Sequence, residues 1–417
     1  MRDLGWIEAA LVAARPRTVA ALLRYFRDLD RAEEAFQDAC LRALTAWPKN
    51  GPPRDPAAWL IMVGRNAAID AVRKLSRTTE LPPEEQLSDL DDGETRVSRS
   101  LDEGDYRDDV LRLLFVCCHP DLPATQQIAV ALRVVSGLSV RQIARAFLVG
   151  EAAMEQRITR AKAKIAAAGV PFEAPNAVER AERFAAVAQM VLLVFNEGYS
   201  AGAEGSDRGI LCGEAIRLAR LMLRLFPAEP EMMGLLALLL LQHSRAAARF
   251  DSEGGAILLD AQDRARWNTS MIAEALALVD KAMRHRAPGP FQIQAAIAAL
   301  HARAARPEDT DWVEIDQLYA ALERHAPSPV VTLNRAVATA KVQGPQAALD
   351  MIAPLAARLD GYFYFHGVRG SLLMQLGADR EAHAAFTRAV ALANTPAEAA
   401  HIRQHLDALS AAAMEKK

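Results

Sequence analysis

The sequence predicts an all-α protein, in which two small helical domains joined by an acidic linker are followed by a helical C-terminal half. Three observations support this class. Apolar residues make up 51% of the 417 residues but aromatic residues only 6%, and the abundant Ala, Leu and Arg favour helices. Nearly every segment repeats its apolar residues at the helical period, and no convincing run alternates as a strand does. Clusters of Pro and Gly then divide the helical pattern into blocks.

Composition excludes several classes of protein. The apolar content excludes a disordered chain, and a formal net charge of −3 argues against a small basic nucleic-acid-binding domain. The four cysteines show no disulfide framework, which predicts a reducing cytoplasm. Neither a signal peptide nor a membrane span is expected, because the most apolar stretch, residues 234–241, is far shorter than the ~18–20 residues of a span.

Motifs for catalysis, cofactors and metals are missing from the sequence. There is no phosphate-binding loop, dinucleotide fingerprint, zinc-protease motif or nucleophile elbow. Cys117-Cys118-His119 suggests a metal site, but no second Cys/His pair stands at zinc spacing, so buried thiols are the favoured interpretation. We therefore expect no enzyme, no cofactor and no metal.

Breaks in the helical pattern predict five segments. Residues 78–107 hold a Pro-Pro pair and ten carboxylates against three arginines, which is typical of a flexible, negative linker. A Gly-Val-Pro stop at 169–171 ends the next helical block. The predicted segments are 1–77, 78–107 (the linker), 108–172, 173–290 and 291–417.

The block 108–172 contains a predicted helix-turn-helix. A helix over 139–147, with Ser139 as its N-cap, is followed by a tight turn and a second helix over 151–165. The second helix has an apolar stripe of Met154, Ile158, Ala161 and Ile165, and a cationic stripe of Arg157, Arg160 and Lys164. An exposed cationic stripe on the second helix is what docking in a major groove requires, although a solvated face of a helical bundle looks the same.

The first block predicts two further helices with distinct faces. Over 30–47, an inward stripe (Phe36, Ala39, Ala43 and Trp47) opposes an acidic and amide face of Glu33, Glu34, Gln37 and Asp38 that we expect to point outward. Over 59–74, a polar stripe suited to nucleic acid comprises Asn66, Asp70, Arg73 and Arg77, with Arg65 and Lys74 beside it.

Together the two blocks resemble regions 2 and 4 of the extracytoplasmic-function (ECF) sigma factors of bacterial RNA polymerase. The matching residues are Asp30-x-Ala-Glu-Glu-x-x-Gln-Asp, Trp59-Leu with Arg65-Asn66-x-x-x-Asp70-x-x-Arg73, Leu138-Ser-Val-Arg-Gln-Ile-Ala144 and Arg157-x-x-Arg-Ala-Lys-x-Lys-Ile165. Their order and spacing carry the resemblance, which covers roughly the first 170 residues.

The resemblance implies roles for these residues. The core polymerase would be bound, through its β′ subunit, by Glu33, Glu34, Gln37 and Asp38. The acidic linker would run through the template-strand and RNA-exit channels of the polymerase, and the β subunit is the second expected partner. The melted minus-10 strand would contact Arg54, Trp59, Arg65, Asn66, Asp70, Arg73, Lys74 and Arg77. The minus-35 duplex would be read by Arg141, Glu155, Gln156, Arg157, Arg160 and Lys164. Glu155 either accepts from cytosine or is merely solvated, and aromatic residues for base stacking are few.

The C-terminal half predicts tetratricopeptide (TPR)-like repeats. Gly370, Ala382, Phe386 and Ala389 follow the TPR steps of 12, 4 and 3, and a weaker copy lies one ~34-residue period earlier at Ala336, Ala348, Ile352 and Leu355. An ordinary α-bundle is the alternative. Residues 177–290 resemble an extension found in one ECF subgroup. There, Glu197, His243, Arg245, Arg249, Asp263, Arg264 and Trp267 form either a ligand pocket or an ion-pair network.

The favoured function is therefore an ECF-type sigma factor in the cytoplasm, regulated by its own C-terminal half through a protein or small molecule. The alternative is a helix-turn-helix transcription regulator with a TPR sensor. The first block discriminates between them, because such a regulator has no use for an acidic core-binding face.

Overall fold

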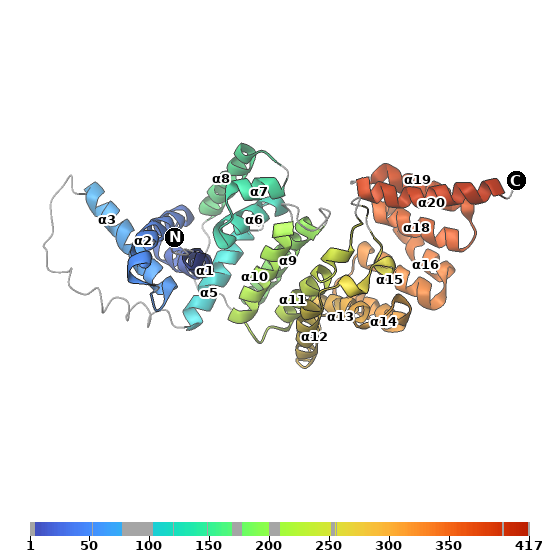
Figure 1. Cartoon of the computed structure of the whole chain (residues 1–417), viewed down its shortest axis with the longest axis horizontal. Coiled ribbons are helices and arrows are strands. Elements are labelled where there is room, and N and C mark those ends of the chain that lie inside the picture. Colours follow the sequence, from blue (N-terminus) through green and yellow to red (C-terminus); the bar gives the residue numbers. More distant parts are fainter. Residues whose placement is uncertain are drawn as a thin grey trace. The chain divides into compact units, whose positions relative to one another are not determined.

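The computed structural model describes residues 5–51, 53–76, 103–119, 121–147, 149–168, 177–199, 209–251, 255, 257–393 and 396–415. Over these residues the chain is built from helices and their connections, and no strand is assigned (Figure 1). The predicted all-α class is confirmed. In the same ranges no helix is long and apolar enough to cross a membrane.

Two compact units divide the chain. The first comprises residues 1–198 and 210–226, and the second comprises residues 199–209 and 227–417. The segment predicted as one extension, 173–290, is therefore split between the two units. Its first helices fall in the same unit as the blocks that resemble sigma regions.

The first block is a three-helix bundle of α1 (Gly5–Phe26), α2 (Leu29–Asn50) and α3 (Pro56–Ser76), in which each helix packs against the other two. The Asp28 side chain caps α2 by accepting from the amides of Asp30 and Arg31. Close approach of α2 and α3 requires glycine at Gly64, because a Cβ there would lie 2.7 Å from the Ala35 carbonyl oxygen. Trp47 is buried on the predicted inward stripe.

The second block packs α5 (Glu103–Cys117) against α1 and places α6 (Ala124–Ala131) against α8 (Glu151–Ala168). A π-turn, η1 (Leu132–Ser136), ends at Gly137 with a φ of 76° and leads into α7 (Val140–Ala146). Helix α5 begins at Glu103, so the last five residues of the predicted linker are helical. Residues 78–102 of that linker lie outside the described residues.

Helices α9 (Ala177–Tyr199) and α10 (Gly209–Leu225) complete the first unit. The Arg183 guanidinium lies 4.8 Å from the centre of the Phe115 ring, which joins α9 to α5. The Cys212 thiol reaches the Phe195 carbonyl oxygen at 3.6 Å, and thereby joins α10 to α9. Through these contacts α9 and α10 belong to the first compact unit.

The second unit begins with α11, whose predicted apolar stretch is buried. A Cβ on Gly234 would lie 2.5 Å from the Gln292 amide nitrogen, so α11 and α13 pack with their backbones close together. The helices of this unit are α11 (Pro230–His243), α12 (Thr269–Met283), α13 (Pro290–Arg303), α14 (Trp312–His325), α15 (Pro329–Gln343), α16 (Pro345–Ile352), α17 (Ala356–Leu359), α18 (Phe363–Gln375), α19 (Asp379–Leu392) and α20 (Pro396–Glu415).

The TPR-like pairing holds in this unit. Successive helices pack as neighbours, α15 on α16 and α18 on α19. A Cβ on Gly370 would lie 2.6 Å from the Phe386 ring. The ring of Phe386 therefore packs directly against the backbone at Gly370, as the repeat pattern predicts. Ala382 and Ala389 are buried beside Phe386, and the earlier copy buries Ala336, Ala348 and Ile352 in its own core.

Candidate nucleic-acid and polymerase interface

Helix α2 presents three of the four predicted core-binding side chains to solvent. Glu34, Gln37 and Asp38 are exposed. The expectation that Glu33 also points outward is wrong, since Glu33 is only 4% exposed. It stands three residues before the buried Phe36 and so shares the inward face of the helix.

Arg15 of α1 explains how a carboxylate is tolerated there. Its Nη2 donates to Glu33 Oε1 at 3.0 Å and to the Arg133 carbonyl oxygen at 3.1 Å. Its Nε donates to the Val134 carbonyl oxygen at 2.8 Å. The guanidinium also lies 4.8 Å from the centre of the Phe36 ring. Buried charges are stable only when paired and hydrogen-bonded in this way.

Lys162 of α8 approaches the same carboxylate from the second block. Its Nζ lies 2.8 Å from Asp30 Oδ1 and 2.5 Å from Glu33 Oε2. Burial opposes its charge, but Glu33 and Asp30 outweigh burial and raise the pKa of Lys162. Lys162 was not among the predicted site residues, although it is the first lysine of the motif Arg157-x-x-Arg-Ala-Lys-x-Lys-Ile165.

The helix-turn-helix has the geometry that the sequence predicts. Ser139 caps α7 in a capping box with Gln142, and the Val149 amide donates to the Ala144 carbonyl oxygen at 3.0 Å across the turn. The predicted apolar stripe of α8 is buried: Met154, Ile158, Ala161 and Ile165. With that face against the core, α8 turns its polar face outward.

Most of the side chains predicted to read the minus-35 duplex are exposed. These are Arg141, Glu155, Gln156, Arg160 and Lys164, whereas Arg157 is half-buried. Arg141 Nε lies 3.4 Å from Glu151 Oε2, which links the two helices of the motif on their exposed side. The guanidinium groups of Arg141 and Arg160 and the amide of Gln156 are thus exposed on the same motif. Such groups suit contacts with phosphates and base edges.

The minus-10 candidates are described only in part. Arg54 is exposed, Trp59 and Asn66 are half-buried, and the side chains of Asp70, Arg73 and Lys74, like all of Arg77, lie outside the described residues. Trp59 meets Trp47 edge-on, with 5.4 Å between ring centres. Asp55 caps α3 through the Ala57 and Ala58 amides, which fixes the loop that carries Arg54.

Tyr25 is an aromatic residue that was not among the predicted minus-10 contacts. It lies in the last turn of α1, is 54% exposed, and lies edge-on to Phe26 with 4.9 Å between ring centres. The Arg65 guanidinium lies 5.9 Å from the centre of its ring. An exposed ring beside a cation is the usual platform for an unpaired base. No sequence spacing links Tyr25 to Arg65, since the two meet only through the packing of α1 on α3.

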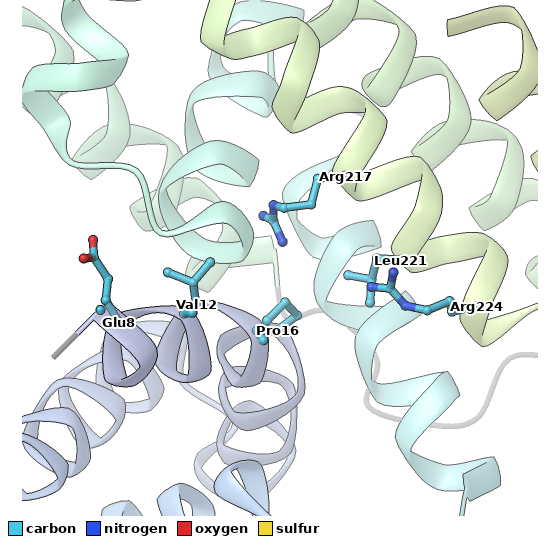
Figure 2. A pocket seen from close by; sticks show the side chains of 9 residues that line it. Glu8, Val12, Pro16, Arg217, Leu221 and Arg224 are labelled. Carbon is cyan, nitrogen blue, oxygen red and sulfur yellow. The ribbon is translucent and has the colours of Figure 1, made fainter. Parts of the chain in front are cut away.

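A shallow groove of about 540 Å³ lies between α1 and α10 (Figure 2). Val12, Pro16 and Leu221 form its apolar part, while Arg217 and Arg224 stand on α10. Arg217 Nε is bound to Glu214 at 2.9 Å. Of the arginines that line the groove, Arg217 is therefore already engaged within its own helix.

The predicted ligand pocket or ion-pair network of the C-terminal half appears as two contact groups. In the first, Arg245 donates to the Tyr199 hydroxyl at 2.9 Å and to Gln242, and Arg249 lies 3.4 Å from the centre of the Tyr199 ring. His243 is the last residue of α11 and follows Gln242 directly. Glu197 belongs to α9 in the first unit.

In the second group, Arg264 lies 4.8 Å from the centre of the Trp267 ring and donates to the carbonyl oxygens of His301 and Ala304 at 2.6 and 2.5 Å. Asp263 accepts from the Ala265 amide and so caps a short 3₁₀ helix, η4 (Arg264–Arg266). Arg264 is thus fixed by backbone oxygens at the end of α13.

Several buried polar atoms around Arg264 have no hydrogen-bond partner: Arg264 Nε and Nη2, Trp267 Nε1, Gln262 Oε1, His301 Nδ1 and Thr310 Oγ1. Burial, and then the charge of Arg245, lowers the pKa of His301 to about 4. Buried polar atoms in native proteins are nearly always hydrogen-bonded. The cluster around Arg264 departs from this rule.

The Cys117 and Cys118 thiols of the second block are buried, whereas Cys40 of the first block is half-buried. Burial raises the pKa of Cys118 to about 12 and the pKa of Cys117 well above its ordinary range. Across the residues the structure describes, no group of three His, Cys, Asp or Glu side chains is arranged to hold a metal ion.

Comparison with known proteins matches three parts of the chain. Residues 11–78 match the family described as Sigma-70 region 2, residues 112–165 match Sigma-70 region 4, and residues 183–283 match a family of unknown function, DUF6596. An uncharacterized protein of Rhizobium meliloti (strain 1021), R00370, is 71% identical over 413 residues, which cover 99% of this chain and 97% of that protein. Yeast Tom70 aligns with 98% of this chain and 85% of its own at 14% identity, with a TM-score of 0.38.

Proposed function

The chain belongs to the sigma-70 family, and from this premise we propose that it is an ECF-type sigma factor. It binds core RNA polymerase, recognises promoter DNA and starts transcription without covalent catalysis, in the cytoplasm where the chromosome lies. One observation supports this most directly: a single compact unit carries both an exposed acidic and amide face on α2 and an exposed cationic face on α8.

The faces have different partners. Glu34, Gln37 and Asp38 bind the β′ subunit of the polymerase, while α8 enters the major groove of the minus-35 element and contacts phosphates through Arg160 and Lys164. The α3 surface and the preceding loop capture the melted minus-10 strand, with Tyr25 and Arg65 adding a stacking platform. Because holoenzyme assembly brings these faces to DNA, the chain needs no large net positive charge of its own.

Run-off transcription tests this function. Purified chain plus core polymerase should give discrete transcripts from a subset of genomic fragments, and core polymerase alone should not. The runner-up function, a regulator outside the polymerase, predicts DNA binding without core polymerase and no co-purification with it. A chain that never co-purifies with core polymerase would therefore favour the regulator.

The C-terminal half, we propose, regulates initiation. It contains a TPR-like array, and such arrays present extended surfaces to other proteins. Removing residues 227–417 keeps every helix of the first unit and deletes the described helices of the second. The truncated chain should still bind core polymerase but give a changed transcript yield. Equal yields at equal solubility would leave the second unit without a regulatory role.

The cluster around Arg264 is the candidate ligand site in that half. Two guanidinium nitrogens of Arg264 without a hydrogen-bond partner, Nε and Nη2, and the indole N–H of Trp267 form a set rich in donors, which suits a small oxyanion such as a carboxylate or phosphate. Inorganic phosphate or acetate should raise the melting temperature of the chain, and Arg264→Ala should remove the rise. The exposed neighbour Arg266→Ala is the matched control.

A further inference from the structure

We propose that the second unit binds a small hydroxy carboxylate, with the carboxylate on the guanidinium group of Arg264 and the hydroxyl on the side-chain oxygen of Gln262. The proposal rests on the proposed oxyanion site of the C-terminal half, and it names the class of ligand that this site takes. The Arg264 site is defined by Gln262, Arg264, Trp267, His301 and Thr310, which all belong to the second unit.

The guanidinium group of Arg264 is held on one side and open on another. Its Nη1 donates to the carbonyl oxygens of His301 and Ala304 at 2.6 and 2.5 Å, and its Cζ lies 4.8 Å from the centre of the Trp267 ring. Nε and Nη2 share the other edge of the group, and both are buried without a hydrogen-bond partner among the described residues. Because such an edge offers two parallel N–H groups, it matches the two oxygens of a carboxylate.

Three further side chains of the site are more than nine-tenths buried. The exposed fractions are 5% for Trp267, 8% for Gln262 and 6% for Thr310. Trp267 Nε1, Gln262 Oε1 and Thr310 Oγ1 likewise have no hydrogen-bond partner within the part of the chain that the structure describes. Burying a polar group without a partner is costly. A ligand that pairs with these atoms as well as with Arg264 would remove this cost.

Gln262 requires a donor on the ligand. Its Nε2 donates to the Ile257 carbonyl oxygen at 3.0 Å. Because a carbonyl oxygen can only accept, this bond settles which end of the Gln262 amide is nitrogen and leaves Oε1 as the open acceptor. An oxyanion without a donor would leave Oε1 unpaired. The ligand therefore carries an O–H or N–H group in addition to its carboxylate.

The charges around the site favour a hydroxyl as that donor. Burial, and then the charge of Arg245, lowers the pKa of His301, and Arg264 acts in the same direction against the opposing charge of Asp260. The positive charges that disfavour a proton on His301 also disfavour an ammonium group on a ligand. A second negative charge on the ligand is disfavoured in turn, because Asp260 and Asp309 already act on the Arg264 guanidinium. A monoanion with a neutral hydroxyl meets both conditions.

Four probes test the ligand class by isothermal titration calorimetry on the full-length chain. Lactate (both enantiomers), propanoate and alanine have the same carbon skeleton and carry a hydroxyl, a hydrogen and an ammonium group on the same carbon; inorganic phosphate is the fourth probe. Lactate should bind at least about fivefold more tightly than propanoate, which is the size of one neutral hydrogen bond, and more tightly than alanine and phosphate. Lactate that binds no better than propanoate, or less tightly than alanine or phosphate, would overturn the hydroxy carboxylate.

Variants assign each half of the ligand to its residue. Gln262→Leu should abolish the preference for lactate over propanoate, and Arg264→Ala should abolish the binding of both. Circular dichroism confirms folding; if Arg264→Ala is not folded, Trp267→Phe serves, since it keeps a ring beside the guanidinium but lacks the indole N–H and should weaken both acids at least about threefold. The exposed neighbour Arg266→Ala should bind like the parent chain.

The outcomes separate this proposal from those on which it rests. A preference for lactate that persists in folded Gln262→Leu, or carboxylate binding that persists unchanged in folded Arg264→Ala or Trp267→Phe, would overturn the assignment. Equal binding of lactate, propanoate and phosphate that Arg264→Ala removes would overturn the hydroxy carboxylate and keep the oxyanion site, and binding of no probe would overturn both. A chain that gives no transcripts with core polymerase would overturn the sigma function instead, while the calorimetry would still decide the ligand.

Discussion

Arg15 and Glu33 form a nearly solvent-free ion pair, 3.0 Å long, between the first two helices of the chain. The pair does more than join two neighbouring helices, because the same guanidinium donates to backbone oxygens of the second sigma region. Breaking it leaves a buried carboxylate with a single cationic partner, Lys162. Stability and interdomain packing are thus coupled at one side chain.

Arg15→Met is expected to lower the free energy of unfolding of the full chain by about 3–5 kcal/mol, the usual cost of removing one member of a buried pair. The control is Arg17→Met. Arg17 pairs with Asp55 at the same 3.0 Å, but their side chains are 25% and 33% exposed, so its loss should cost at most about 1 kcal/mol. Urea titration followed by circular dichroism measures both. Equal losses for the two variants would contradict the buried role of Arg15.

Asp38→Arg is expected to weaken holoenzyme assembly at least about tenfold, or ~1.4 kcal/mol, because it reverses a charge on the exposed face of α2. It should not change the unfolding midpoint, since the side chain lies in solvent. Glu8→Arg makes the same charge change on an exposed position of α1 and should assemble normally. Fluorescence anisotropy with labelled chain and core polymerase gives the affinities; equal affinity for both variants would remove Asp38 from the polymerase face.

Arg157→Ala is expected to weaken promoter binding by the holoenzyme by about 1–3 kcal/mol if the side chain contacts a base. Arg157 is half-buried on α8 between the apolar stripe and the exposed face, so part of any loss could arise from packing. Unfolding of the free variant separates the two effects. Arg145→Ala on α7 is the control, and filter binding to a promoter mapped by run-off transcripts is the measurement. An unchanged affinity would exclude Arg157 from the reading surface.

Tyr25→Ala is expected to shorten the lifetime of the open complex, because stacking on an aromatic ring is worth about 1–3 kcal/mol per base. Tyr25→Phe keeps the ring beside Arg65 and should keep the lifetime. Permanganate footprinting of unpaired thymines after a heparin challenge follows the decay. If the alanine variant decays no faster than the parent, the exposed ring of Tyr25 has no role in strand capture.

Local patterns predicted much of the fold, because helical periodicity and capping depend on residues close in sequence. The stripe from Met154 to Ile165 and the Ser139 cap are of this kind, and both are confirmed. The small-to-large pairing of Gly370 with Phe386 also followed from repeat spacing. These features need no knowledge of distant partners.

Contacts between distant segments could not be predicted in the same way. Glu33 was expected on the outer face with Glu34, Gln37 and Asp38, yet its partners stand 18 residues before it and 129 residues after it. The contact of Arg183 with Phe115 across a Pro-rich break is of the same kind. One sequence shows that Arg15 and Lys162 are cations, but not that they meet.

His301 gives the chain a pH dependence whose sign follows from its pKa. Burial lowers the pKa of His301 to about 4 in the folded chain, whereas an unfolded histidine has a pKa near ~6.5. Between pH ~6.5 and ~4 the His301 side chain is therefore protonated in the unfolded chain but not in the folded chain. The free energy of unfolding falls as the pH drops through this range.

His301→Asn should remove this loss. Relative to the parent chain, the variant should gain free energy of unfolding as the pH falls from 7.5 to 5, by ~1–2 kcal/mol at the lower end, with a constant difference above pH ~7.5. Urea titrations of both chains at several pH values measure the difference, and His325→Asn, which replaces a histidine at the end of α14, is the control. Parallel curves for parent and His301→Asn would show that the ring is not held neutral by burial beside Arg245 and Arg264.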